Sequence, residues 1–427
     1  MANIVLYPSP GMGHLVSMVE LGKLILTHHP HHQITIVTVT PPFNAGATVA
    51  YIKSVSAATT SLTFHSLPAI TLPLPLDSYD SMNIIMHDLL QLSIPHVHQF
   101  LQSLRSISAV SAFIIDMFCS SALYTSDDLD IPCYFFFTSG ANCLSTILYL
   151  PTLHESTTRS FKDMEEDEVL HIPGVPPTPP TDMIVPVLDR NGPGYASFLE
   201  IAALFTKSSG IIINTFNSLE NRVPESILRG DCVPNGHTPP LFCVGPLIVN
   251  SHYNDGAGDR ENCLEWLDRQ PEQSVVFLCF GSLGVFSAEQ LKEIAIGLER
   301  SGKRFIWAVR SPPAKDRKNR YLSPPEPDLD FLLPEGFLER TRNRGMVIKS
   351  WAPQVEILNH GSVGGFVTHC GWNSVLEAVC AGVPMVAWPL YAEQRLNRLY
   401  LVEGLAVALP LKEDDAVLWR RRKWRNG

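Results

Sequence analysis

The sequence predicts an α/β protein with two doubly wound domains, each built on a parallel sheet. The chain has 427 residues, which is too long for one ordinary core. In both halves, short apolar runs alternate with helical stretches, as in strand–helix–strand units. A stretch rich in Pro, Gly, Asn and Asp at 239–258 separates the halves. We therefore expect domains at 1–248 and 263–412, a linker at 249–262 and an atypical tail at 413–427.

The first half is expected to open with a strand at Ile4–Tyr7, a Pro/Gly loop and an amphipathic helix from His14 to Thr27. Other short apolar runs predict buried strands at Gln33–Thr38, Leu62–Ser66, Ala112–Asp116, Cys133–Phe137, Gly210–Asn214 and Leu241–Leu247. The proline-rich segment 173–180 would suit partner recruitment, but we interpret it as a rigid loop beside a cleft.

The second half is expected to begin with a helix near Cys263–Leu267 and to carry helices from Ala288 and over Trp372–Ala381. Strands are predicted at Val275–Phe280, Arg304–Val309, Met346–Ser350, Val363–Thr368, Val383–Trp388 and Val407–Leu409. The polar, proline-rich stretch 312–332 is interpreted as a surface loop.

Composition excludes several classes of partner. The net charge of −10 argues against a nucleic-acid partner, because such proteins carry basic surfaces. The nine cysteines are scattered without zinc-ligand spacing, which is typical of reduced thiols in the cytosol. The first residues lack the basic lead of a signal peptide, and no apolar run reaches the length of a membrane span. We expect a cytoplasmic monomer without membrane insertion.

The segment from Trp351 to Gln394 combines features that suit a nucleotide-sugar site. Trp351 could stack on a base, and the helix from Trp372 begins where a strand ends, which makes a natural anion site. The alternatives without a ligand are that Trp351 is an aromatic residue of the core and that His369 is a structural, hydrogen-bonded histidine. The spacing of Ser374 and Glu377 also fits a capping box.

The Gly/Ser turn at 281–284 is a second place where backbone N–H groups could meet a phosphate, with Ser282 as a side-chain contact. A simple helix cap is the alternative for this turn.

His14 and Asp116 form a candidate base–carboxylate pair. Each follows or ends a predicted strand, so both should lie at the carboxyl edge of one parallel sheet. A histidine at a helix start should be neutral, and a carboxylate on its other ring nitrogen would fix its tautomer. Such a histidine can take a hydroxyl proton as a bond forms. The alternatives are a helix-start residue and a strand-end or capping residue.

Residues 351–394 (WAPQVEIL to YAEQ) resemble, over their whole length, the signature box of the plant family-1 UDP-dependent glycosyltransferases. PSPGMGH at 8–14 and IIDMFC at 114–119 resemble the segments that carry the catalytic histidine and aspartate of that family. The chain is most similar to the flavonoid and chalcone O-glucosyltransferase branch. The resemblance implies the GT-B fold, in which two Rossmann-like domains face each other across a cleft. The N-terminal domain would bind the acceptor and the C-terminal domain the UDP-sugar.

The resemblance also implies the roles of individual residues. Trp351 would stack on uracil and Ala352 would pair with it, while Gln354 and Glu377 would hold the ribose. The diphosphate would be bound by His369, Asn373 and Ser374, and the sugar by Trp372, Glu393 and Gln394. Gln394 at the end of the box favours UDP-glucose as the donor. The acceptor pocket would include Phe118 and Phe135.

The expected reaction is inverting transfer of glucose from UDP-glucose to a hydroxyl of a small phenolic acceptor, giving a β-O-glucoside. No carboxylate cluster suited to Mg²⁺ is evident, so neither a metal nor another cofactor is expected. The family normally continues with several more helices after position 414, and residues 415–427 match none of them. We therefore expect a C-terminally truncated form that lacks the terminal helices.

Two alternatives to this function, and two motifs that could suggest other ligands, have to be weighed. The chain could be a catalytically impaired, UDP-sugar-binding remnant. A dinucleotide-dependent dehydrogenase fits the fold pattern but lacks the Gly-x-Gly-x-x-Gly turn. The histidines at 28, 29, 31 and 32 could indicate a metal, and RRRKWR at 420–425 an anionic partner; we interpret both as solvated segments.

Overall fold

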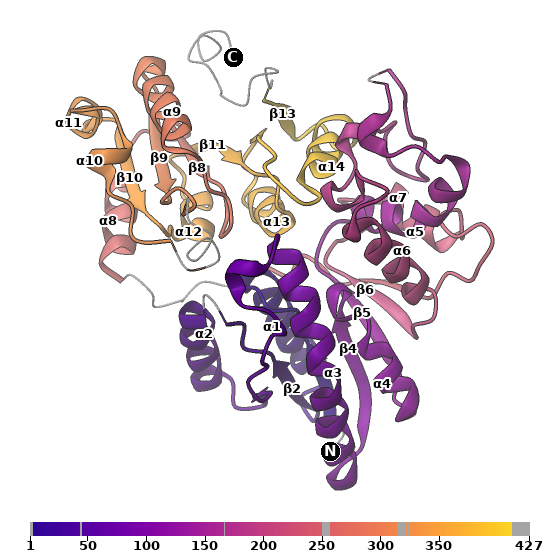
Figure 1. Ribbon diagram of the computed structural model, residues 1–427. Helices are drawn as coiled ribbons and strands as arrows, with labels where there is room; N and C mark the ends of the chain where they lie inside the picture. Colours follow the sequence, from indigo (N-terminus) through magenta and orange to yellow (C-terminus); the bar gives the residue numbers. More distant parts are fainter. Residues whose placement is uncertain are drawn as a thin grey trace. The chain divides into compact units, whose positions relative to one another are not determined.

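The computed structural model describes residues 3–42, 45–165, 167–249, 257–314, 322 and 324–411 (Figure 1). The chain divides into two compact units. The first unit comprises Met1–Val249 together with Tyr391–Gly404, and the second comprises Asn250–Leu390 and Leu405–Gly427. The expected linker at 249–262 lies mostly outside the described residues, as do the tail and its basic run.

The first unit is built on a seven-stranded sheet in the order β3-β2-β1-β4-β5-β6-β7, with every neighbouring pair parallel. Its strands are β1 (Asn3–Tyr7), β2 (Gln33–Thr38), β3 (Leu62–Ser66), β4 (Val110–Asp116), β5 (Cys133–Phe137), β6 (Gly210–Ile213) and β7 (Leu241–Cys243). Their apolar residues are buried because helices cover a parallel sheet on both faces. The doubly wound first domain is confirmed, and its strands begin and end within a few residues of the predictions.

The helices of the first unit alternate with these strands. They are α1 (Met12–His28), α2 (Ala45–Ala58), α3 (Met82–Ile107), α4 (Ala122–Asp128), α5 (Ala141–Ser156), α6 (Pro193–Phe205) and α7 (Arg222–Leu228). The segment Tyr391–Gly404 adds α14 (Gln394–Leu399), which packs against α5. Assigning this segment to the second domain, as the sequence analysis did, differs from the observed division. Chain order predicted the second domain, whereas side-chain packing places the segment on the first unit.

The second unit is built on a six-stranded parallel sheet in the order β10-β9-β8-β11-β12-β13. Its strands are β8 (Val275–Cys279), β9 (Arg304–Val309), β10 (Gly345–Lys349), β11 (Val363–Thr368), β12 (Met385–Ala387) and β13 (Ala408–Pro410). Its helices are α8 (Ala257–Asp268), α9 (Ala288–Ser301), α10 (Leu329–Leu332), α11 (Phe337–Thr341), α12 (Gln354–Leu358) and α13 (Trp372–Ala381). The second doubly wound domain is therefore confirmed.

Local sequence explains why the helices begin where they do. Ser287 accepts a hydrogen bond from the backbone of Gln290 and caps α9, and Gly302 ends that helix with a left-handed backbone. Leu291, Ile294 and Leu298 form the buried face of α9 and pack into a core that contains Trp307.

Among the described residues, no helix is both long enough and apolar enough to cross a membrane.

Candidate active site

His14 and Asp116 lie together at the carboxyl edge of the first sheet. Strands β1 and β4 are neighbours in parallel register, with Tyr7 opposite Ile115, so the residues that follow them emerge side by side. Nδ1 of His14 lies 2.7 Å from Oδ2 of Asp116. The structure thus brings the predicted base–carboxylate pair within hydrogen-bonding distance.

Asp116 is both the partner of His14 and a cap, so the two interpretations of this residue are compatible. Its side chain is fully buried, and Oδ1 accepts a hydrogen bond of 3.0 Å from the backbone N–H of Phe118. The carboxylate is therefore held at both oxygens, which orients it toward the imidazole. Phe118 is 42% exposed, and its ring meets the ring of His14 edge-on with centroids 5.5 Å apart.

The pKa of His14 is raised above its ordinary value. Burial alone would lower the pKa of this imidazole, but the charge of Asp116 and its hydrogen bond outweigh burial, and Glu393 adds a smaller contribution. The helix-start argument therefore misjudged this group, because the neighbouring carboxylates favour the charged ring. The same carboxylate stabilises the imidazolium that forms when His14 accepts a proton.

The sequence analysis missed Thr138, which also belongs to this edge. It follows β5, the strand beside β4, and its Oγ1 lies 3.2 Å from Nδ1 of His14. The carboxyl-edge argument that selected Asp116 would have selected Thr138 as well.

Placing Phe135 in an acceptor pocket was wrong. Its side chain has no exposed surface, and its ring packs edge-on against Phe205 with centroids 4.7 Å apart.

In the second unit, residues predicted to bind uridine lie around the start of α12. Trp351 is 45% exposed, as a stacking platform requires, whereas Ala352 is buried. Nε2 of Gln354 donates hydrogen bonds to Oε2 of Glu377 at 2.6 Å and to Oγ of Ser374 at 2.8 Å. Burial raises the pKa of Glu377 to about 7.

These contacts test the capping-box interpretation of Glu377. A capping box would require a side chain to cap α13, but the residue at that position is Gly371 and no side-chain cap bond is present. Glu377 is instead bonded by Gln354 from a different helix. The capping-box interpretation was therefore wrong.

The N-terminus of α13 lies a short turn after β11, at the position where the sequence predicts an anion site. His369 is buried, which lowers its pKa to about 4, so its ring is neutral at physiological pH. Gly281 has φ of +71° at the end of β8, and a Cβ there would lie only 2.5 Å from Nε2 of His369. The 281–284 turn therefore packs directly against the histidine. Ser282 is exposed beside it, and Ser374 lies in the first turn of α13.

Trp372 is buried within the second unit, with 3% of its surface exposed, and Asn373 follows it in the helix. The last two predicted donor residues, Glu393 and Gln394, belong to the first unit. Oε1 of Gln394 accepts a hydrogen bond of 2.9 Å from the backbone of Tyr391, which closes the turn before α14.

Three residues with strained backbone lie next to predicted donor residues. Ser350, Cys370 and Ala392 have φ of +61°, +67° and +55°, although none is a glycine. Each such residue costs roughly 1–3 kcal/mol and persists only where its surroundings hold it. The three lie next to Trp351, next to the start of α13 and next to Glu393. Of the non-glycine residues with positive φ in the described part of the chain, these three lie beside predicted donor residues, whereas Asp130, Gln273 and Ala406 do not.

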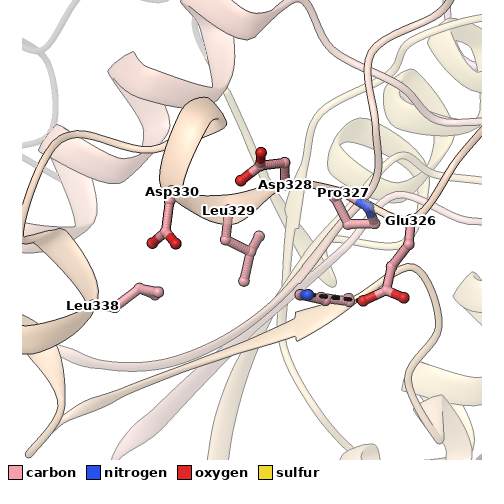
Figure 2. Close-up of a pocket in the computed structure, with 7 residues that line it drawn as sticks. Glu326, Pro327, Asp328, Leu329, Asp330 and Leu338 are labelled. Atoms are coloured by element: carbon pink, nitrogen blue, oxygen red, sulfur yellow. Dashed lines mark hydrogen bonds and ion pairs between the residues drawn. The ribbon is translucent and has the colours of Figure 1, made fainter.

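Other features of the described residues do not form a second centre. No group of three or more His, Cys, Asp or Glu residues that could hold a metal ion occurs within the described ranges. The histidines at 28, 29 and 31 are exposed at the end of α1, as interpreted from the sequence. A surface pocket of about 410 Å³ is lined by Glu326, Pro327, Asp328, Leu329, Asp330, Leu338 and Lys349 (Figure 2). It contains none of the predicted site residues.

The two doubly wound units and the histidine–aspartate pair fit the predicted class of nucleotide-sugar-dependent glycosyltransferases. The family model of the UDP-glucoronosyl and UDP-glucosyl transferases matches residues 246–413. Relatives align over almost the entire chain, and the chain belongs to the UDP-glycosyltransferase family. The predicted family is therefore confirmed.

Two of these relatives are UDP-glycosyltransferase 88B1 of Stevia rebaudiana and anthocyanidin 5,3-O-glucosyltransferase of a Rosa hybrid cultivar. Each is 49% identical to this chain, and the alignments cover 96% of this chain and 86% of the relative. A similar solved structure is that of Phytolacca americana UGT2 complexed with UDP-2fluoro-glucose and pterostilbene. It has a TM-score of 0.87 and 36% identity, covering 99% of this chain and 89% of that one. The predicted GT-B fold is shared with such structures.

Proposed function

We propose that this protein transfers glucose from UDP-glucose to a hydroxyl of a small phenolic acceptor of the flavonoid, isoflavone or chalcone type, with inversion to a β-O-glucoside. The observation that carries the proposal is the bond of 2.7 Å between His14 and Asp116 in a member of this family. Relatives named for anthocyanidin and phloretin O-glucosylation support the acceptor class and the sugar.

His14 is the general base in this proposal. Its Nδ1 donates to Asp116, which leaves Nε2 to accept the proton of the acceptor hydroxyl. A phenol has a reference pKa of about 10 and a histidine about 6.5, so the proton moves as the new bond forms and not before. The buried carboxylate then stabilises the imidazolium.

The second unit would bind and stabilise the UDP leaving group. The first backbone N–H groups of α13 lie at the positive end of the helix dipole, where an anion is favoured. Ser282, Asn373 and Ser374 would add donors to the diphosphate, and the neutral His369 would add another. Trp351 and Ala352 would hold the uracil.

Gln354 and Glu377 would bind the ribose, because a carboxylate can accept from both ribose hydroxyls. Trp372, Glu393 and Gln394 remain predictions for the sugar. Phe118, exposed beside the ring of His14, would contact a flat phenolic acceptor.

The proposal includes metal independence, since α13 and its neighbouring donors supply positive potential where the diphosphate would leave. It also includes a cytoplasmic, monomeric enzyme, in keeping with free cysteines throughout the described residues.

The test is incubation of the purified chain with UDP-glucose and a panel of flavonoids, isoflavones and chalcones, with products identified by mass and by the anomeric coupling in NMR spectra. A β-glucoside is expected, and its rate should be the same with Mn²⁺ as with a chelator. His14→Ala should lower the rate roughly 100- to 10,000-fold.

Binding of UDP without any glucoside would overturn the enzymatic proposal and support the alternative of a UDP-sugar-binding protein without transferase activity. Strict dependence on added Mn²⁺ would contradict metal independence alone. Near-normal transfer by His14→Ala would refute the assignment of the base.

A further inference from the structure

The carboxylate of Glu393 is held by two buried side chains of the first unit. Its Oε1 lies 3.1 Å from Oγ of Ser139, which donates to it, and 3.4 Å from Nδ2 of Asn397. Ser139 is 8% exposed and Asn397 is fully buried. Both donors converge on one oxygen, and neither uses Oε2.

Asn397 is itself oriented by a second buried asparagine. Nδ2 of Asn142, at the start of α5, donates to Oδ1 of Asn397 at 3.3 Å. Since an amide has one oxygen, this bond turns the NH₂ group of Asn397 toward Glu393. The backbone N–H of Asn142 donates to the buried carboxylate of Glu220 at 3.2 Å, which holds the start of α5.

The backbone around Glu393 is also tied to the first unit. Ala392, with its left-handed backbone, accepts a hydrogen bond of 2.9 Å from the N–H of Val185. Arg398, one turn after Glu393, binds both oxygens of Asp182 at 2.6 and 2.7 Å, and the side chain of Asp182 is almost fully buried. These bonds hold the segment Tyr391–Gly404 on both sides of the carboxylate.

We propose that Ser139 and Asn397 are positioning residues that orient the carboxylate of Glu393 toward the hydroxyls of the donor sugar, so that the sugar is recognised by the unit that carries the general base. This rests on the proposed function, in which Glu393 contacts the sugar. The charge of Glu393 also raises the pKa of His14, which places the two groups within electrostatic reach inside one unit. Glu393 and His14 thereby belong to one packed unit.

The experiment compares binding of UDP-glucose with binding of UDP, by calorimetry, for the wild-type chain and for Asn397→Asp and Ser139→Ala. Ionised Asp has the shape of Asn but offers Glu393 no donor and places a second negative charge beside it, so the variant removes the orienting bond, and UDP binding in the same variant reports whether the fold is kept. Asn191→Asp, at an exposed position of the same unit, is the matched control.

We expect Asn397→Asp to weaken UDP-glucose binding roughly tenfold and to leave UDP binding within about twofold of wild type. Preference for UDP-glucose over UDP-galactose should fall in the same variant, and Asn191→Asp should match the wild type. Ser139→Ala should act in the same direction, and the double variant should lose less than the sum of the two, because both donors act on one oxygen.

Equal weakening of UDP and UDP-glucose would refute the proposal, since it would indicate general destabilisation. Unchanged discrimination in Asn397→Asp would refute it as well. The binding readout does not require transfer, so a wild-type chain that binds UDP-glucose without transferring it would refute the proposed function and still test the positioning pair.

Discussion

Replacing Asp116 by Asn should separate its charge from its shape. The amide keeps an oxygen that can accept from the backbone of Phe118, as Oδ1 does now at 3.0 Å. Its NH₂ group would then face His14 and require Nδ1 to act as an acceptor, which places the proton on Nε2. The variant therefore presents the wrong tautomer to the acceptor hydroxyl.

The magnitude follows from the bond that is lost. A hydrogen bond to a charged group contributes about 1.5–3 kcal/mol, and the 2.7 Å contact in a fully buried carboxylate belongs to this class. Because the bond strengthens as His14 becomes charged, its loss should lower kcat/KM roughly 10- to 150-fold.

The pH profile provides a second, signed readout. The neutral form of His14 is the base, so kcat/KM should rise with pH as His14 loses its proton. The midpoint of this acid limb should lie above the ordinary histidine pKa of about 6.5. Removing the charge of Asp116 leaves burial, which lowers the pKa of His14, opposed only by the smaller contribution of Glu393, so the limb should move to lower pH. Activity at alkaline pH should stay depressed.

The assay is the initial rate of glucoside formation between pH 5 and 9, with Asp128→Asn, an exposed carboxylate in α4, as the control. UDP affinity should be unchanged in both variants. An acid limb that stays in place or moves to higher pH in Asp116→Asn would refute the reasoning, as would an unchanged kcat/KM.

The remaining predictions concern the donor and acceptor sites. Gly281→Ala should weaken UDP binding at least tenfold in calorimetry, because its Cβ would lie 2.5 Å from His369. The control is Gly302→Ala, which has a similar φ of +66° and no atom within 4 Å of the added Cβ. Equal loss of UDP binding in both variants would implicate backbone strain alone. UDP-glucose should bind more tightly as pH rises through about 7, because Glu377 then becomes a carboxylate that can accept hydrogen bonds from ribose. Glu377→Gln should flatten this pH dependence. A pH profile that the substitution leaves unchanged would contradict the assignment of Glu377 to the ribose. Phe118→Ala should raise the KM for phenolic acceptors several-fold without changing UDP affinity, and unchanged acceptor kinetics would remove it from the acceptor site.

Local pattern was enough to predict the sheets and the pairing of His14 with Asp116. Buried parallel strands such as Gln33–Thr38 and Val363–Thr368 are continuous apolar runs, so their limits are visible in the chain. His14 and Asp116 could be paired because parallel strands end at a common edge, an argument that requires no side-chain packing. The same argument extends to Thr138 and would have found it.

The sequence could not predict how charges balance around His14 or which strand residues pack into the core. The direction of the pKa shift of His14 depends on burial set against two carboxylates, one of them 379 positions away at Glu393. Phe135 belongs to the same kind of apolar run as other strand residues, and only its contact with Phe205 shows that it is core. The capping-box interpretation of Glu377 was excluded only by the position at which α13 begins and by the bond from Gln354, which lies on another helix.

The sequence by itself determined the α/β class, the two sheets, the family and the residue types of the site, because these follow from periodicity and from short motifs read in order. Only the tertiary structure showed that Glu393 and Gln394 belong to the unit of His14, although they close a motif whose residues up to Leu390 lie in the second unit. The physical reason is that this segment is held by bonds to Asn142, Asp182 and Val185. Those partners lie more than two hundred positions earlier, and no local pattern around residue 393 encodes them.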